Sequence, residues 1–314
     1  MLGGLRPRSY LARLQLSYGV RLTREASKQL TFAAYTDESA ITAERFRSVC
    51  VVSMPRTLEG RFSQEIAACL SSSDVAEFKW TELNNAKKRF CANKMIDAVL
   101  NHLGVDSLRV DVLVWDTQDA RHTVSNRDDA ANLERMFFHL LRTTMSRRES
   151  ADWHVFPDER PGTDWATLRD CLASVGSWVR RFDYPLLREA HAELSFRIRE
   201  LTPVKSHVTP VVQVADLFAG MAAFSRKHEG VFKEWTEATD PQQQLFGQSE
   251  APALSNRLRE RFQVIPELAA KCRARRLGVS LRTEGYLVTK NPTYPLNFWH
   301  YVPQNDRDRA PTRR

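Results

Sequence analysis

Short runs of apolar, β-branched and aromatic residues recur along the first two thirds of the chain and predict the strands of a sheet. Each run is bounded by polar residues or proline, which is typical of buried strands. The runs occupy residues 30–36, 48–53, 108–115, 153–156 and 195–199. Longer segments with a helical period separate them, so the pattern predicts an α/β domain.

Apolar residues at helical spacing predict the helices between these strands. They cover about 58–70, 85–103, 127–145 and 163–175, and a further helix begins at Pro210. Thr163 and Thr209 are the expected N-caps of the last two helices, and proline suits a first helical position.

Acidic residues follow three of the predicted strands. They are Asp37 and Glu38 after the first strand, Asp116 at the end of the third, and Asp158 after the fourth. Strand ends of open α/β sheets face the crevice where ligands usually bind, so Asp37 is placed to hold a metal ion or a proton. The alternative is that these residues only turn the chain or cap a helix.

The helix that begins at Pro210 carries polar residues in an apolar surrounding. Gln213, Asp216 and Gly220 share one face by their spacing, while the neighbouring positions are mainly apolar. A buried charge without a partner is costly, so this face needs a partner. A metal or a substrate is one candidate, and a nearby Lys or Arg is the other.

The composition indicates a soluble cytoplasmic protein with a tilt towards polyanionic partners. The 314 residues carry a net charge of +8, and the pI is about 9.4. The five cysteines are scattered without a zinc pattern, which fits free thiols in a reducing compartment. The most apolar stretch, 208–224, is too short and too polar to span a membrane.

Both ends of the chain are basic. Residues 1–30 hold six Lys and Arg against a single acid, as in a transit peptide or a nucleic-acid-contacting arm. In the segment 227–314, a loop over 240–252 and a basic helical piece over 257–276 precede several aromatic residues. These are Tyr286, Tyr294, Phe298, Trp299 and Tyr301. They suit single-stranded nucleic acid, or they pack this segment onto the domain.

Five short motifs in the same order give the chain a family resemblance. They are DES at 37–39, EFK at 77–79, DER at 158–160, KSH at 205–207 and QVADLFAG at 213–220. Together they resemble the family called domain of unknown function 3800, over about residues 31–226. That resemblance implies a ribonuclease H-like mixed sheet flanked by helices, here with a basic N-terminal arm and a C-terminal extension. Ala40 stands where members of that family usually have glycine.

The resemblance also implies a set of site residues. The acids matching the motifs are Asp37, Glu77, Asp158 and Asp216, and the accompanying polar positions are Lys79, Lys205, Ser206 and Gln213. Asp116 competes with Asp158 for the role of the second strand acid. We favour Asp158 because it lies in the DER motif.

Clustered carboxylates suit phosphodiester hydrolysis with two Mg²⁺ or Mn²⁺ ions about 3.5–4 Å apart. Asp37 is expected to bridge the ions, with Glu77, Asp158 (or Asp116) and Asp216 completing their ligands. Lys79 or Lys205 would offset phosphate charge. The leading hypothesis is thus a nuclease acting on DNA or RNA. The alternatives are a non-catalytic module that binds nucleic acid or a partner, and acids held in structural ion pairs.

Overall fold

The computed structural model describes residues 30–40, 44–119, 128–148, 150–178, 196–239, 252–281 and 284–302. The predicted basic arm therefore lies outside the described residues, apart from Leu30, and so does nearly all of the predicted loop over 240–252.

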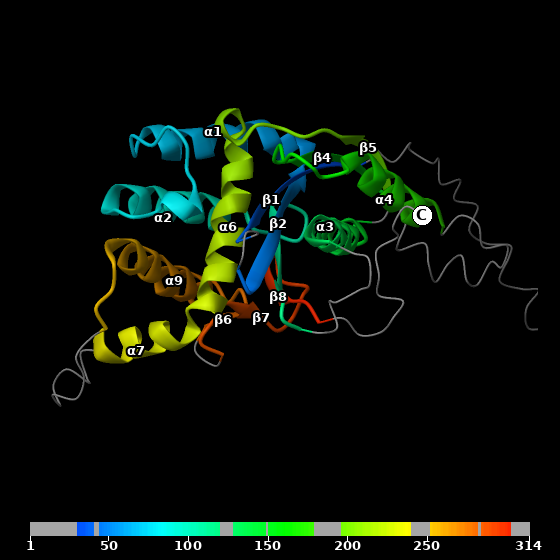
Figure 1. The fold of residues 1–314 in the computed structure, drawn as a ribbon. Helices are drawn as coiled ribbons and strands as arrows, with labels where there is room; N and C mark the ends of the chain where they lie inside the picture. Colours follow the sequence, from blue (N-terminus) through cyan, green and yellow to red (C-terminus); the bar gives the residue numbers. More distant parts are fainter. Residues whose placement is uncertain are drawn as a thin grey trace, which may run out of the picture.

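A mixed sheet of six strands, in the order β5-β4-β1-β2-β3-β8, forms the centre of the molecule (Figure 1). The strands β1, β2 and β3 are antiparallel neighbours, β4 and β5 continue parallel to β1, and β8 is parallel to β3. The bounds are β1 Thr31–Ser39, β2 Phe46–Pro55, β3 Arg109–Asp116, β4 Asp152–Pro157, β5 Arg197–Leu201 and β8 Leu296–His300. A separate pair joins β6 (Val279–Ser280) and β7 (Val288–Thr289).

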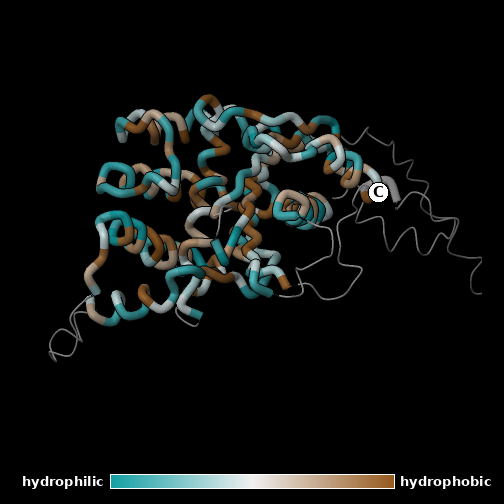
Figure 2. The backbone as a smooth tube through the Cα atoms, in the orientation of Figure 1, coloured by the Kyte–Doolittle hydropathy of each residue, from teal (hydrophilic) through white to brown (hydrophobic). Residues whose placement is uncertain are grey.

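Helices cover both faces of the sheet. On one face lie α1 (Arg56–Ser71), α2 (Ala86–His102), α6 (Pro210–Lys227), α7 (Glu229–Thr239) and α9 (Asn256–Ala274). On the other lie α3 (Asp129–Met145) and α4 (Trp165–Trp178). Each face has its own cluster of buried apolar side chains. Figure 2 shows hydrophobic residues concentrated in the sheet and hydrophilic ones on the outer turns of α1 and α2.

The predicted α/β class is confirmed, and the five predicted strands and helices are all present with ends shifted by a few residues. Of the two expected N-caps, Thr163 is wrong, and Thr209 is confirmed in position. Asp164, and not Thr163, accepts the N–H of Thr167 at 2.9 Å, because its carboxylate is the better acceptor at the start of α4. Thr209 precedes α6 as expected but makes no capping bond.

The C-terminal segment is built into the same core as the rest of the chain. Its strand β8 extends the sheet beside β3, and Arg89 of α2 is paired with Glu260 of α9 at 2.7 Å. Phe298 and Tyr301 are buried. Of the two interpretations of these aromatic residues, packing onto the domain therefore holds for this pair, and their rings are not exposed for stacking on bases.

All five cysteines are free thiols, three of them buried, as expected. Within the described ranges, no helix has both the length and the apolar character needed to cross a membrane.

Candidate functional site

Asp37 and Asp158 lie side by side because their strands are parallel neighbours. Thr36 of β1 is in register with Pro157 of β4, and the N–H of Asp158 donates to the Thr36 carbonyl at 2.8 Å. Asp37 is only 5% exposed, and one of its oxygens accepts the N–H of Glu38 at 2.7 Å. Two acids far apart in sequence thus reach the same edge of the sheet.

Helix α6 brings a third acid to this edge. It packs across β1 and β2, where the hydroxyl of Ser48 donates to the carbonyl of Ala219 at 2.7 Å. Asp216, one turn earlier on α6, is 7% exposed. Its Oδ2 accepts the N–H of Trp80 at 2.6 Å, so this contact uses one of the two carboxylate oxygens.

The polar face predicted on this helix holds the backbone of residues 78–80. Gln213 accepts the N–H of Phe78 and donates to the carbonyl of Ser206, both at 2.8 Å. A Cβ at Gly220 would collide with the ring of Trp80, so only glycine fits there. The expected partner of Gln213 and Asp216 was a metal, a substrate or a basic side chain. The partners of these two side chains include backbone N–H groups, which sequence patterns do not reveal.

Residues 77–80, held to α6 by these bonds and called the docked segment below, present Glu77 and Lys79 to Ser206. The hydroxyl of Ser206 donates to Glu77 at 2.6 Å, and Lys79 Nζ lies 2.8 Å from the same hydroxyl and 3.2 Å from Glu77. The bonds from Ser206 and Lys79 outweigh burial and hold the pKa of Glu77 below its usual value. Glu77 was expected to be a metal ligand, and here it is bound to Lys79 and Ser206. Lys205 is exposed next to Ser206.

The acids at this edge raise one another's pKa. Burial is the main cause for Asp37, and the charges of Asp216, Glu38 and Asp158 add to it. Burial also raises the pKa of Asp216 to about 7, against the bond from Trp80. For Asp158 burial again dominates, with Lys79 acting in the opposite direction. The raised pKa values mean that these carboxylates favour a bound proton, or a cation in its place, over the free charged form.

Glu38 and Arg160 belong to this site although the motifs did not assign them a role. Their side chains form an ion pair. Burial raises the pKa of Glu38, and the guanidinium of Arg160 opposes that rise. Both residues lie inside the DES and DER motifs, so the signal was present, but only the fold shows that they meet.

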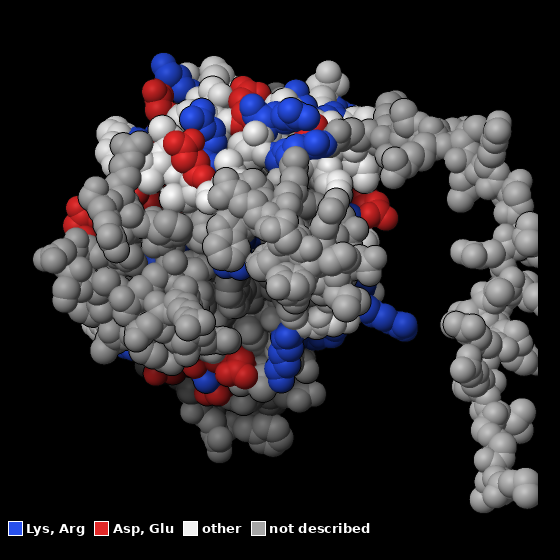
Figure 3. Space-filling view, turned by 90° about the vertical axis from the view of Figure 1, so that its right-hand side faces the viewer, with Lys and Arg blue, Asp and Glu red and all other residues white. Residues whose placement is uncertain are grey.

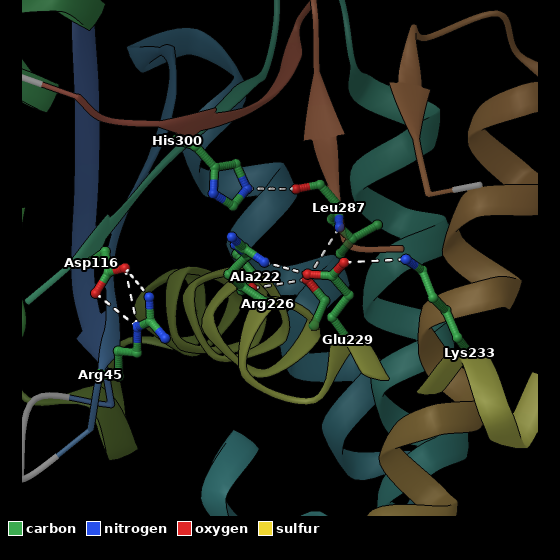
Figure 4. Close-up of polar contacts among 9 residues, drawn as sticks. Arg45, Asp116, Ala222, Arg226, Glu229, Lys233, Leu287 and His300 are labelled. Atoms are coloured by element: carbon green, nitrogen blue, oxygen red, sulfur yellow. Dashed lines mark hydrogen bonds and ion pairs between the residues drawn. The ribbon is translucent and has the colours of Figure 1, made fainter. Parts of the chain in front are cut away.

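Asp116, the other candidate for the second strand acid, lies away from this group. In the sheet register Asp37 faces Cys50, whereas Asp116 faces Phe46, four residues further along β2, or about 13 Å. Asp116 instead accepts hydrogen bonds from Nε and Nη2 of Arg45, the shortest at 2.7 Å (Figure 4). The bond from Arg45 is the main cause that lowers the pKa of Asp116. Asp158 is thus the strand acid beside Asp37.

The donors fit a hard divalent cation in kind and in charge, because Mg²⁺ and Mn²⁺ prefer carboxylate oxygens. Within the part of the chain that the structure describes, no three His, Cys, Asp or Glu groups have the spacing of a finished metal site. The arrangement is a concentration of buried and half-buried acids from three parts of the fold.

Comparison with known proteins places the chain among relatives. No family model matches it. Two proteins of Methanothermobacter thermautotrophicus, described as "Uncharacterized protein ORF2" and "Uncharacterized protein ORF2'", are each 35% identical to it over 291 residues. The matches cover 90% of this chain and 98% of each relative.

Proposed function

The chain belongs to the family of these ORF2 proteins, and we propose that it is a Mg²⁺- or Mn²⁺-dependent nuclease that hydrolyses phosphodiester bonds of DNA or RNA. One observation carries the proposal. Two buried aspartates, Asp37 and Asp216, and the half-buried Asp158 come from the ends of two strands and from a helix to one edge of the sheet, where burial and neighbouring acids raise the pKa of each. Buried like charges are costly unless a cation compensates them.

The topology supports the finer proposal of a ribonuclease H-like fold and of kinship with the domain of unknown function 3800. Three antiparallel strands are followed by parallel strands on the β1 side. The acids stand on the first strand, just after the fourth and on a late helix. That is the distribution of acids which the resemblance implies.

The proposed roles follow from the contacts. Asp37, Asp158 and Asp216 would hold the ions, which supply an activated water and stabilise charge on the leaving oxygen. Lys79 would attract the substrate phosphate, and Glu77 and Ser206 position its ammonium group. Gln213 holds the segment that carries Lys79 and so acts as a positioning residue.

Basic side chains also suit a polyanionic substrate. On the face drawn in Figure 3 several of them lie along the upper edge, interspersed with Asp and Glu, on the side on which α1, β4 and β5 lie in Figure 1. The net charge of +8 also favours a polyanionic substrate.

The test is a calorimetric titration of Mn²⁺ into the wild type and two matched variants. Asp37→Asn removes a buried acid of the group, and Asp116→Asn removes a strand-end acid outside it. We expect binding in the wild type and in Asp116→Asn but not in Asp37→Asn, and the same order in cleavage of single- and double-stranded DNA and RNA. Equal binding by all three proteins would contradict the assignment. Salt-sensitive binding of nucleic acid without any Mn²⁺ binding or cleavage would instead support a non-catalytic binding module.

A further inference from the structure

A second feature lies further along α6 from the carboxylates. A cavity of about 120 Å³ opens between the end of β1, the docked segment, α6 and α9. Its walls include Trp80, Gly220, Phe224, His228 and Arg261. This volume is several times the space that one water molecule needs. The cavity shares Trp80 with the carboxylate site, since the N–H of Trp80 is bound to Asp216.

Arg261 places a half-buried positive charge in this cavity. Its Nη2 donates to the Trp80 carbonyl at 2.8 Å, and its guanidinium lies 5.5 Å from the ring centres of both Trp80 and Phe224. Its Nε is buried without a hydrogen-bond partner. Burial lowers the pKa of Arg261 to about 10, so this cation has lost much of its hydration.

No carboxylate among the described residues forms an ion pair with Arg261. The contrast with Arg109 is direct, because that buried arginine is bound by Asp111 through two bonds of 2.6 and 2.7 Å. Lys227, which also lines the cavity, is paired with Glu44 at 2.6 Å. A desolvated guanidinium without an acid is costly, and it presents the donor geometry that phosphate oxygens match.

We propose that this cavity is a subsite for a phosphate group, with Arg261 as its main ligand, and that it holds a backbone phosphate of the nucleic acid whose scissile bond lies at Asp37 and Asp216. The statement that the phosphate belongs to a nucleic acid cleaved at Asp37 and Asp216 rests on the proposed function. Phe224 lies eight residues beyond Asp216 on α6, about 12 Å along the helix. At about 3.4 Å per nucleotide along the strand of a duplex, this distance corresponds to about three to four nucleotides between the subsite and the cleavage point.

The experiment compares Arg261→Gln, Arg261→Lys and the wild type, with Arg259→Gln as the control. Arg259 is an exposed arginine of the same helix. Binding of labelled single-stranded DNA and RNA is measured by anisotropy at several salt concentrations in EDTA, which keeps the carboxylate site free of metal. Thermal unfolding with inorganic phosphate, against chloride of equal ionic strength, shows whether free phosphate is also a ligand.

For Arg261→Gln we expect affinity for the strand to fall about tenfold or more and the salt slope to fall by about 0.7. Arg261→Lys keeps the charge and should keep most of the slope, and Arg259→Gln should change affinity much less. A response to inorganic phosphate alone, lost in Arg261→Gln, would support the subsite and assign it to free phosphate. A folded Arg261→Gln protein that binds strands and phosphate like the wild type would overturn the subsite and leave Arg261 as a support for Trp80.

Separate measurements test the phosphate subsite and the proposed nuclease, so either hypothesis can be wrong while the other holds. Asp37→Asn removes an acid of the carboxylate site and leaves Arg261 unchanged, so it should keep the wild-type response to phosphate in EDTA. Loss of that response in Asp37→Asn would contradict a separate subsite. Absence of Mn²⁺ binding in the wild type would count against the nuclease without altering the phosphate result.

Discussion

Two buried aspartates of the central sheet have opposite surroundings. Asp111 of β3 is 1% exposed, and it accepts two bonds from Arg109, one from Thr144 at 3.2 Å and one from Asn297 at 3.1 Å. Asp37 of β1 is 5% exposed, and its bond of 2.7 Å comes from its own neighbour Glu38. One carboxylate is fully compensated, and the other is surrounded by further acids.

The difference separates a structural charge from one that is available for a ligand. The network around Asp111 fixes β3 against α3 and β8, so its negative charge is used within the fold. The charge on Asp37 is not used in this way, although Lys79 and Arg160 lie near the group. A fold tolerates such a charge at a site that binds a cation or a proton.

The largest effect is expected at Asp111. Asp111→Asn leaves Arg109 buried beside a neutral group, which should lower the free energy of unfolding by about 3–5 kcal/mol. Asp37→Asn removes repulsion among buried acids and should leave stability in metal-free buffer unchanged or higher. Urea unfolding of the two variants at pH 7.5 with EDTA measures both. A loss of stability in Asp37→Asn as large as in Asp111→Asn would show that Asp37 is also a structural charge.

A second effect is the pH dependence that Asp216 gives to the metal-free protein. Its pKa in the folded protein is about 7, against an ordinary value of 3.8, so the folded state binds its proton more tightly. This contribution is fully present below about pH 4 and is lost as the pH rises through about 7. Asp216→Asn keeps an acceptor for the Trp80 N–H and removes the titration. We expect the wild type to lose stability between pH 5 and 8 by about 2–3 kcal/mol more than the variant.

Thermal unfolding of both proteins across that range in EDTA measures the difference. Asp116→Asn is the control, because the pKa of Asp116 is lowered, so that titration acts in the opposite direction. Parallel curves for the wild type and Asp216→Asn would contradict a raised pKa at Asp216.

Local patterns predicted the elements well because strand and helix periods are properties of short segments. The spacing of Gln213, Asp216 and Gly220 also predicted one shared face, and that face exists. Its partner could not be predicted, because a backbone N–H has no signature in the sequence. The same limit applies to Arg261. In the sequence it is one of many basic residues of α9, and only the fold shows that it lies against Trp80 and Phe224.

The choice between Asp116 and Asp158 shows what strand order adds. Both acids follow a strand, and the residues around them favour Asp158 only through the DER motif. The neighbours of β1 in the sheet are β2 and β4, and this puts Asp158 beside Asp37. Strand order depends on contacts between distant segments, so no local pattern contains it.

The smallest effect concerns the backbone just after the acids of β1. Ala40 has φ 62°, in the left-handed region that glycine adopts freely, whereas the family resemblance expects glycine there. Ala40→Gly should therefore raise the free energy of unfolding by about 1 kcal/mol, while Ala67→Gly at an exposed position inside α1 should lower it by a similar amount. Urea unfolding measures both changes, and Mn²⁺ binding by Ala40→Gly should equal that of the wild type. If Ala40→Gly instead weakened Mn²⁺ binding, the strained turn would itself hold Asp37 in place, and the contrast with Asp111 would extend from charge to backbone conformation.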